Sequence, residues 1–291
     1  MYVILHNPLS KNKKSKRTTK KVVESFKANN VPFRLKSLLK IKDIETYIRN
    51  APKEITVILL GGDGTINTFI NNTFNLPFEK TVYVKGNGSG NDFLRYLKKN
   101  RTSHQAIMTM RYNDKKRHFI NGSGLGMDGE IANRVNQAKK KNRFNYIINA
   151  LKTFASFKPH YMEVSIDGVL HTFNKGYLVN INSGQYIGGG MRITPQGDVE
   201  DDTLDVIVVH SINRVMLFLI FLSVYFGIHP RFSRYVFYKK GKHIKASMFS
   251  QQVAQCDGET FERTREIEVK HSGKYAFFTP FDLDAIKTNK P

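Results

Sequence analysis

The residues best suited to chemistry stand in a glycine-rich segment, Leu59–Phe69, which reads LLGGDGTINTF. The continuous apolar run Ile55–Leu60 predicts a buried strand that ends at Gly61-Gly62, and a helix is expected from Thr65. The first backbone N–H groups of a helix attract anions, and glycines let a phosphate approach the backbone closely. Because GK[ST] is missing, the segment is not a Walker A loop. It predicts a phosphate-binding turn of another kind.

Asp63 stands among these glycines, where its negative charge would repel a phosphate. A bridging Mg²⁺ or a fixed hydrogen-bonding role for the carboxylate would remove this conflict. The alternative is that Asp63 only caps the following helix. A second glycine loop, in the segment Lys85–Leu97 (KGNGSGNDFLRYL), follows the next expected strand. Loops at the carboxyl ends of neighbouring parallel strands are where open α/β sheets bind ligands.

The segments that must position these loops alternate between strand and helix patterns up to Leu97. Strands are expected at 2–5, 33–39, 55–60 and 81–84, and helices at 18–28, 41–49 and 65–72. This alternation predicts an open parallel sheet. After about His118 the pattern becomes mainly antiparallel β, and Asp167-Gly168 predicts a hairpin. Further strands are expected at 175–183, 203–211, 234–240 and 265–278, with helices at 145–157 and 214–226.

The formal net charge is +22, from 46 Lys and Arg against 24 Asp and Glu. A nucleic acid, an anionic membrane or an acidic substrate could each account for it. The sequence contains no helix-turn-helix, RRM or zinc-finger pattern, so nucleic acid is not expected as a partner. Its nine histidines show no metal-binding spacing.

The single cysteine, Cys256, fits a reducing compartment such as the cytoplasm. The apolar run at the N-terminus, Tyr2–Leu5, is too short for a signal peptide. The longest apolar run, Val215–Ile228, is shorter than the ~20 residues of a membrane-spanning helix. We expect that run to form a buried core helix, and contact with acyl chains is the alternative.

Several segments, in order, resemble the diacylglycerol kinase catalytic-domain family, which includes bacterial soluble lipid kinases and is related to sphingosine kinases. They are HNPLS near the N-terminus, GGDGTIN, GNGSGNDF, NGSGLGMDGEIA from Asn121, and CDGE at Cys256–Glu259. GGGMRITPQGDVEDDTLDV, at 188–206, resembles the family's GGG…P…DG-x-LD stretch. GGDGT is shared with NAD kinases and phosphofructokinases, whereas the later segments select the lipid kinases. The resemblance covers essentially the whole chain.

The resemblance implies an α/β nucleotide-binding domain with a parallel sheet at 1–118, joined by a C-terminal return at 276–291. It implies a mainly antiparallel β-sandwich lipid and metal domain at 119–275. Catalytic roles are implied for Glu259, as general base, and for Asp63. A Mg²⁺ site is implied at Asp201 with the backbone carbonyls of Asp198 and Thr203. The implied nucleotide-binding residues are Asn7, Pro8, Leu9, Ser10, Lys11, Gly62, Asp63, Gly64, Thr65, Ile66, Asn67, Thr68 and Ser89.

The residues alone leave some of these roles open. CDGE is as typical of a hairpin tip with Glu259 in solvent as of a catalytic base. Asp128 is expected to be a helix N-cap. The chain also departs from the family pattern, with Thr68 where Glu is common, Gly86 where Pro is usual, and Asp202 at a Gly position.

We expect ATP- and Mg²⁺-dependent phosphorylation of a lipid hydroxyl, diacylglycerol giving phosphatidate, in phospholipid biosynthesis. The expected location is the cytoplasm, peripheral at an anionic membrane surface, and a homodimer would be ordinary. The alternatives are another lipid kinase such as a sphingosine-like enzyme, a NAD kinase, a basic nucleic-acid-binding protein, and a catalytically silent membrane-bound nucleotide sensor.

Overall fold

A computed structural model describes residues 1–8, 12–52, 54–76, 81–86, 91–100, 104–138, 143–284 and 286. The chain divides into two compact units. The first comprises Met1–Gln105 with Tyr275–Pro291, and the second comprises Ala106–Lys274. The division falls ahead of the boundary expected at His118, because the strands just before that residue belong to the sheet of the second unit.

The sheet of the first unit is wholly parallel and has the order β14-β4-β3-β1-β2. This confirms the predicted α/β architecture. β2 and β3 lie on opposite sides of β1. The chain runs from β1 to one side of the sheet to form β2, and then crosses to the other side to form β3. The boundary between β1 and β3 is therefore a topological switch point. Open α/β sheets bind ligands at such a switch point. The strands are β1 (Tyr2–His6), β2 (Phe33–Ser37), β3 (Thr56–Gly61), β4 (Val82–Gly86) and β14 (Phe278–Pro280).

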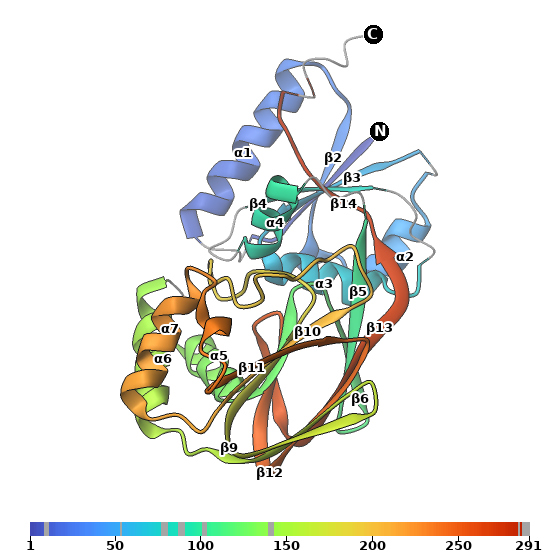
Figure 1. Ribbon diagram of the computed structural model, residues 1–291. Coiled ribbons are helices and arrows are strands. Elements are labelled where there is room, and N and C mark those ends of the chain that lie inside the picture. The colour runs from blue at the N-terminus through green and yellow to red at the C-terminus, as the bar shows by residue number, and fades with distance from the viewer. Residues whose placement is uncertain are drawn as a thin grey trace. The chain divides into compact units, whose positions relative to one another are not determined.

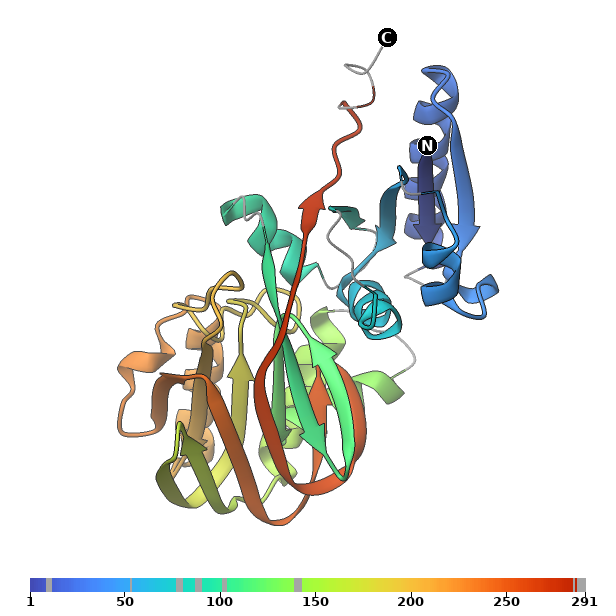
Figure 2. The ribbon, with the colours of Figure 1, turned by 90° about the vertical axis from the view of Figure 1, so that its right-hand side faces the viewer.

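Helices flank this parallel sheet (Figure 1, Figure 2). Alternate residues of the central strands, Ile4, Ile58 and Leu60, share one buried cluster with Val22 and Phe26 of α1. All five side chains are fully buried, as expected where a helix covers a parallel sheet. The helices are α1 (Asn12–Ala28), η1 (Leu38–Lys40), α2 (Ile44–Arg49), α3 (Asp63–Thr73) and α4 (Asp92–Asn100).

The second unit is built on a nine-stranded sheet, and the pairings described are antiparallel. This confirms the predicted mainly antiparallel β domain. The hairpin predicted at Asp167-Gly168 is also confirmed, since both residues have positive φ, 50° and 87°. The strands are β5 (Gln105–Tyr112), β6 (Lys115–Phe119), β7 (Gly122–Gly126), β8 (His160–Ile166), β9 (Val169–Asn182), β10 (Leu204–His210), β11 (Val236–Gly241), β12 (His243–Cys256) and β13 (Glu259–Ala276).

Two apolar cores hold this unit together. The first lies among the strands. The second lies between the sheet and the helices α5 (Met127–Gln137), α6 (Arg143–Ser156) and α7 (Arg214–Val224). Figure 1 shows α6 and α7 side by side, and the rings of Phe154 and Phe221 meet edge-on between them at 5.1 Å.

One face of α7 is buried in the second core, through Leu217, Ile220, Phe221 and Val224. The expectation of a buried core helix is therefore confirmed for that face alone, because other apolar side chains of α7 are exposed. Within the described part of the chain, no helix has the length and apolar character needed to cross a membrane.

Candidate active site

The first candidate site is the start of α3, which follows β3 at the switch point of the sheet. Gly62 takes the N-cap position of α3 and has no side chain to bind the first N–H groups of the helix. Gly64 is exposed, and a Cβ added to it would meet no described atom within 4 Å. At Gly61, by contrast, an added Cβ would lie 2.3 Å from the Cβ of Thr65. Gly61 is thus needed by the fold, whereas Gly64 leaves space beside N–H groups that favour an anion.

Asp63 is bonded to the start of the neighbouring helix α4. Its Oδ2 accepts a hydrogen bond from the N–H of Asp92 at 2.8 Å, and its Oδ1 accepts one from the N–H of Phe93 at 3.3 Å. A carboxylate at a helix N-terminus is also favoured by the helix dipole. The structure therefore supplies the fixed hydrogen-bonding role considered above. The alternative that Asp63 is the N-cap of its own helix is wrong, because Gly62 occupies that position.

Two expected nucleotide-binding residues meet across the switch point. The side-chain amide of Asn7 donates to Oγ1 of Thr65 at 3.4 Å, and the main-chain N–H of Asn7 donates to the carbonyl of Leu60 at 3.3 Å. Within α3, the hydroxyl of Thr68 donates to the carbonyl of Gly64 at 2.8 Å. The bond between Asn7 and Thr65 holds the end of β1 against the start of α3.

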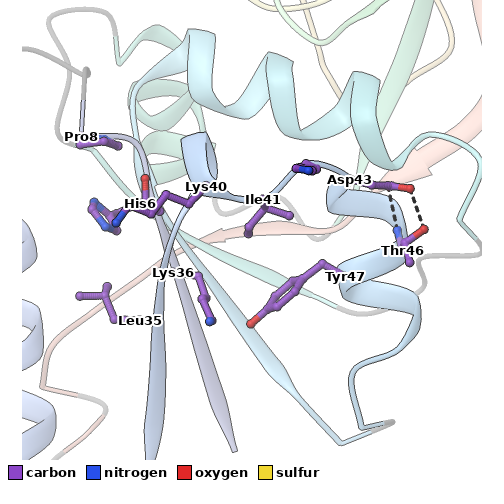
Figure 3. Close-up of a pocket in the computed structure, with 11 residues that line it drawn as sticks. His6, Pro8, Leu35, Lys36, Lys40, Ile41, Asp43, Thr46 and Tyr47 are labelled. Carbon is purple, nitrogen blue, oxygen red and sulfur yellow. Dashed lines mark hydrogen bonds between the residues drawn. The ribbon is translucent and has the colours of Figure 1, made fainter.

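A cavity of about 800 Å³ opens beside Pro8 at the carboxyl ends of β1 and β2 (Figure 3). This volume is typical of sites for small ligands. Partial burial lowers the pKa of His6 in its wall. The carboxylate of Asp43 is already bonded to the N–H and hydroxyl of Thr46 at 2.9 and 2.6 Å. The lining residues are His6, Pro8, Leu35, Lys36, Ser37, Lys40, Ile41, Lys42, Asp43, Thr46 and Tyr47.

Three lysines give this cavity a cationic wall, which suits an anionic ligand. Apart from Pro8, none of its lining residues was expected at a site. The available signal was the position of Lys36 and Ser37 at the carboxyl end of a parallel strand.

The second candidate site is the hairpin tip between β12 and β13. Asp257 and Gly258 form the turn with positive φ values of 48° and 82°, typical of a two-residue hairpin. The carboxylate of Asp257 accepts hydrogen bonds from the three N–H groups of Ile120–Gly122 at 3.0 to 3.3 Å. Glu259 is exposed. Of the two carboxylates in CDGE, Asp257 therefore anchors the turn and Glu259 is accessible for chemistry.

The turn is also held through Gly258. Its N–H donates to Oε1 of Gln255 at 2.9 Å, and its carbonyl accepts from Nδ2 of Asn136 at 2.9 Å. Nε2 of Gln255 donates in turn to the buried carboxylate of Asp128 at 2.6 Å. Burial raises the pKa of Asp128 to about 6. The expected N-cap role of Asp128 is wrong, since Gly126 caps α5 and Asp128 instead supports the hairpin tip.

The expected metal residues lie in the turn before β10. Oδ1 of Asp201 accepts from the N–H and the hydroxyl of Thr203 at 3.0 and 2.9 Å. Oδ1 of Asp198 accepts from the N–H two residues further on at 3.0 Å. Asp202 forms an ion pair with Lys242 at 2.9 Å. These bonds curl the segment into successive turns.

No group of three or more His, Cys, Asp or Glu side chains that could hold a metal occurs in the ranges that the structure describes. A cation at this turn would therefore rest on the Asp201 carboxylate, backbone carbonyls and water. Such a set of oxygen ligands fits Mg²⁺, which usually keeps several waters.

The structure thus gathers the expected residues into separate groups within each unit. In the first unit, Asn7, Pro8 and the start of α3 lie around the switch point, with Ile66 and Asn67 buried in α3. In the second unit, Glu259 stands on the hairpin tip and Asp201 in the acidic turn. The expected residues Leu9, Ser10, Lys11 and Ser89 lie outside the described residues.

Comparison with known families matches both parts of the chain. Residues 1–121 match the model of the diacylglycerol kinase catalytic domain. Residues 123–269 match the YegS C-terminal NAD kinase beta sandwich-like domain.

Individual relatives are distant. The diacylglycerol kinase of Bacillus subtilis (strain 168) is 24% identical over 216 residues, 70% of each chain. A crystal structure of a diacylglycerol kinase from Bacillus anthracis str. Sterne matches with a TM-score of 0.65 at 19% identity, over 96% of this chain and 97% of that one. Yeast NADH kinase, solved in complex with NADH, matches with a TM-score of 0.50 at 11% identity, over 98% and 84%. At these identities the structural matches show a shared fold.

Proposed function

Because the chain belongs to the diacylglycerol kinase catalytic-domain family, a family of lipid kinases, we propose that it transfers the γ-phosphoryl group of ATP to a lipid hydroxyl. The substrate we propose is diacylglycerol, with phosphatidate as product. The observation that carries the proposal is the pairing, in one chain, of an open glycine turn at a helix start with the exposed carboxylate of Glu259 beside a firmly held hairpin turn.

In the first unit, the start of α3 binds the phosphates of ATP. The N–H groups there favour negative charge, and Gly64 leaves the space that a phosphate needs. The cationic cavity beside Pro8 lies at the same edge of the sheet and accepts the rest of the nucleotide. The carboxylate of Asp63 is bonded to the first N–H groups of α4 and keeps that helix in place. The negative charge of Asp63 is therefore directed at the start of α4.

In the second unit, Glu259 acts as the general base. It accepts the proton of the lipid hydroxyl as that oxygen attacks the γ-phosphorus, and ADP leaves with the bridging oxygen. The bonds of Asp257 and Gly258 fix the turn that carries it, which limits the cost of orienting the base. A Mg²⁺ bound to ATP would neutralise phosphate charge, and a second Mg²⁺ held by the Asp201 carboxylate and the backbone carbonyls of Asp198 and Thr203 would order the acidic turn.

Two other functions share part of this support. NAD kinase shares GGDGT, but the chain carries CDGE and is similar to a curated relative named diacylglycerol kinase, which favours a lipid acceptor. A nucleic-acid-binding role rests on the net charge alone. We further propose that the enzyme works in the cytoplasm, at the surface of an anionic membrane, where its substrate resides.

The direct test is transfer of γ-labelled phosphate from ATP to a panel of diacylglycerol, monoacylglycerol and sphingosine, with NAD as a further acceptor. We expect label in diacylglycerol, identified as phosphatidate by mass. Label in NAD alone, or in no lipid, would contradict the proposal.

The role of Glu259 is tested with Glu259→Gln, which keeps size and polarity but removes the basic oxygen. We expect kcat to fall by roughly 10²–10⁴-fold with little change in ATP affinity. Glu262→Gln is the matched control, because Glu262 is an exposed carboxylate on the same strand and pairs with Lys115. Equal activity of both variants would leave Glu259 as a turn residue only.

A further inference from the structure

The outer face of α7 is apolar where the outer face of a soluble helix is normally polar. Val215 and Phe226 are 72% and 74% exposed, and Phe218, Leu219 and Leu222 between them are exposed as well. We call these five side chains the apolar stripe. The spacing of Val215, Phe218, Leu219 and Leu222 puts them along one side of α7, and Phe226 stands in the turn that follows the helix. The opposite side of α7 is buried in the core of the second unit, so both faces are apolar.

The stretches of sequence that contain α7 and the neighbouring helix α6 carry Lys and Arg but no Asp or Glu. From Val206 to Cys256 the chain has no Asp or Glu but seven Lys and Arg. From Ile131 to Met162, which includes α6, it again has no Asp or Glu and seven Lys and Arg. Since α6 packs beside α7, two helices that lie side by side both come from stretches without a single acidic residue (Figure 1).

The structure places exposed cations on the elements next to the stripe. Lys152 lies on α6 and Arg231 on η2 (His229–Arg231), and both elements contact α7. Lys158, two residues after α6, and Arg234, three residues after η2, are exposed as well. These four residues are the flanking cations. An apolar surface beside cations, formed by stretches of the chain that carry no acidic residue, complements a bilayer that carries anionic headgroups.

Arg214 joins the two helices into one surface. Its guanidinium donates to the carbonyls of Phe154 and Phe157 at the C-terminal end of α6, the latter at 2.6 Å, and lies over the ring of Tyr177 at 5.6 Å. Cations are favoured at helix C-termini. The apolar stripe is therefore presented on a fixed support.

We propose that the apolar stripe, with its flanking cations, docks the second unit on an anionic lipid bilayer, with α7 lying in the plane of the interface. Its 11 residues make α7 about 16 Å long, too short to cross the ~30 Å hydrocarbon core. Partial insertion of the stripe gives the affinity, and the cations select anionic headgroups. This inference builds on the proposed function, because it locates the surface through which a lipid kinase reaches its substrate.

The test is co-sedimentation of the full chain, without ATP, with vesicles of phosphatidylcholine alone or mixed equally with phosphatidylglycerol. We expect binding to the mixed vesicles that weakens as salt is raised. Val215→Ser/Phe226→Ser should lower the partition coefficient by about tenfold or more, because two apolar side chains no longer insert. Val169→Ser/Leu170→Ser is the matched control, since these side chains are 56% and 58% exposed on the hairpin of β8 and β9. It should bind like the parent.

Loss of selectivity for anionic vesicles in Arg231→Gln/Arg234→Gln would support the role of the cations. Equal binding by the stripe variant and the parent overturns the proposal. A parent dimer that the stripe variant converts to a monomer, with vesicle binding unchanged, assigns the stripe to a second copy of the chain and overturns it too. Turnover of dispersed short-chain diacylglycerol is measured in parallel. The stripe variant should turn over this dispersed substrate as the parent does. If the parent itself does not phosphorylate it, the proposed function is contradicted, and the result on vesicle docking is unaffected.

Discussion

Replacement of Gly64 by alanine separates the needs of the fold from those of a phosphate at the start of α3. A Cβ at this position meets no described atom within 4 Å, and Gly64 does not lie in the left-handed region. Since alanine is preferred over glycine in a helix by roughly 0.5–1 kcal/mol, Gly64→Ala should leave the free energy of unfolding unchanged or slightly raised. The new methyl group would occupy the space proposed for a phosphate. We expect the Kd for ATP to rise at least tenfold, about 1.4 kcal/mol.

The assay pairs thermal unfolding, followed by circular dichroism, with calorimetric titration of Mg²⁺-ATP. Gly61→Ala is the contrasting control, because its Cβ would lie 2.3 Å from that of Thr65 and should destabilise the protein directly. If Gly64→Ala is folded and binds ATP as tightly as the parent, the reasoning that a nucleotide phosphate occupies this space is refuted.

Three further predictions concern carboxylates. Asp63→Asn keeps one acceptor oxygen for the start of α4, so we expect urea unfolding to show a loss of stability of about 1 kcal/mol. We expect the same variant to lose most of its phosphotransfer activity. Near-parental turnover would show that Asp63 has a purely structural role. Asp201→Ala should raise the Mg²⁺ concentration needed for half-maximal rate, and an unchanged Mg²⁺ dependence would place the cation elsewhere. Burial raises the pKa of Asp128 in the folded state from 3.8 to about 6, so the protonated form is favoured and stability is lost as pH rises through this range. Asp128→Asn should therefore be more stable than the parent near pH 7, by up to ~3 kcal/mol, with no gain in stability near pH 4. Urea unfolding of both proteins at the two pH values measures this difference. An equal difference in stability at both pH values would contradict the prediction.

Local patterns predicted most elements of the first unit. The apolar run before Gly61 became β3, and the helix after it became α3. Helix ends were less well predicted, because caps decide them. The helix expected from Ile41 begins at Ile44, since the side chain of Asp43 accepts from the N–H of Thr46. Asp and Asn can cap a helix or start a turn, and the sequence alone does not say which.

The β5–β6 hairpin was missed, which put the expected domain boundary at His118. Its turn uses Asn113 and Asp114, at φ 42° and 60°, and lacks the glycine that marks the hairpin at Asp167-Gly168. The roles of Asp63 and Asp128 were not readable either, since each depends on a partner distant in sequence. Asp63 binds the start of α4, and Asp128 binds Gln255. Such long-range hydrogen bonds leave no local pattern.

The bonds from Asp63 to α4 have a consequence for how the first unit fluctuates. The amide protons of Asp92 and Phe93 are held by the side chain of Asp63, the first residue of α3. When the start of α3 opens, these amides lose their acceptor and become free to exchange with solvent, so opening of the α3 turn also frees the start of α4. A nucleotide that holds the α3 turn would then protect the start of α4 from exchange as well. Hydrogen exchange at these two amides thus reports occupancy of the α3 turn from a neighbouring helix.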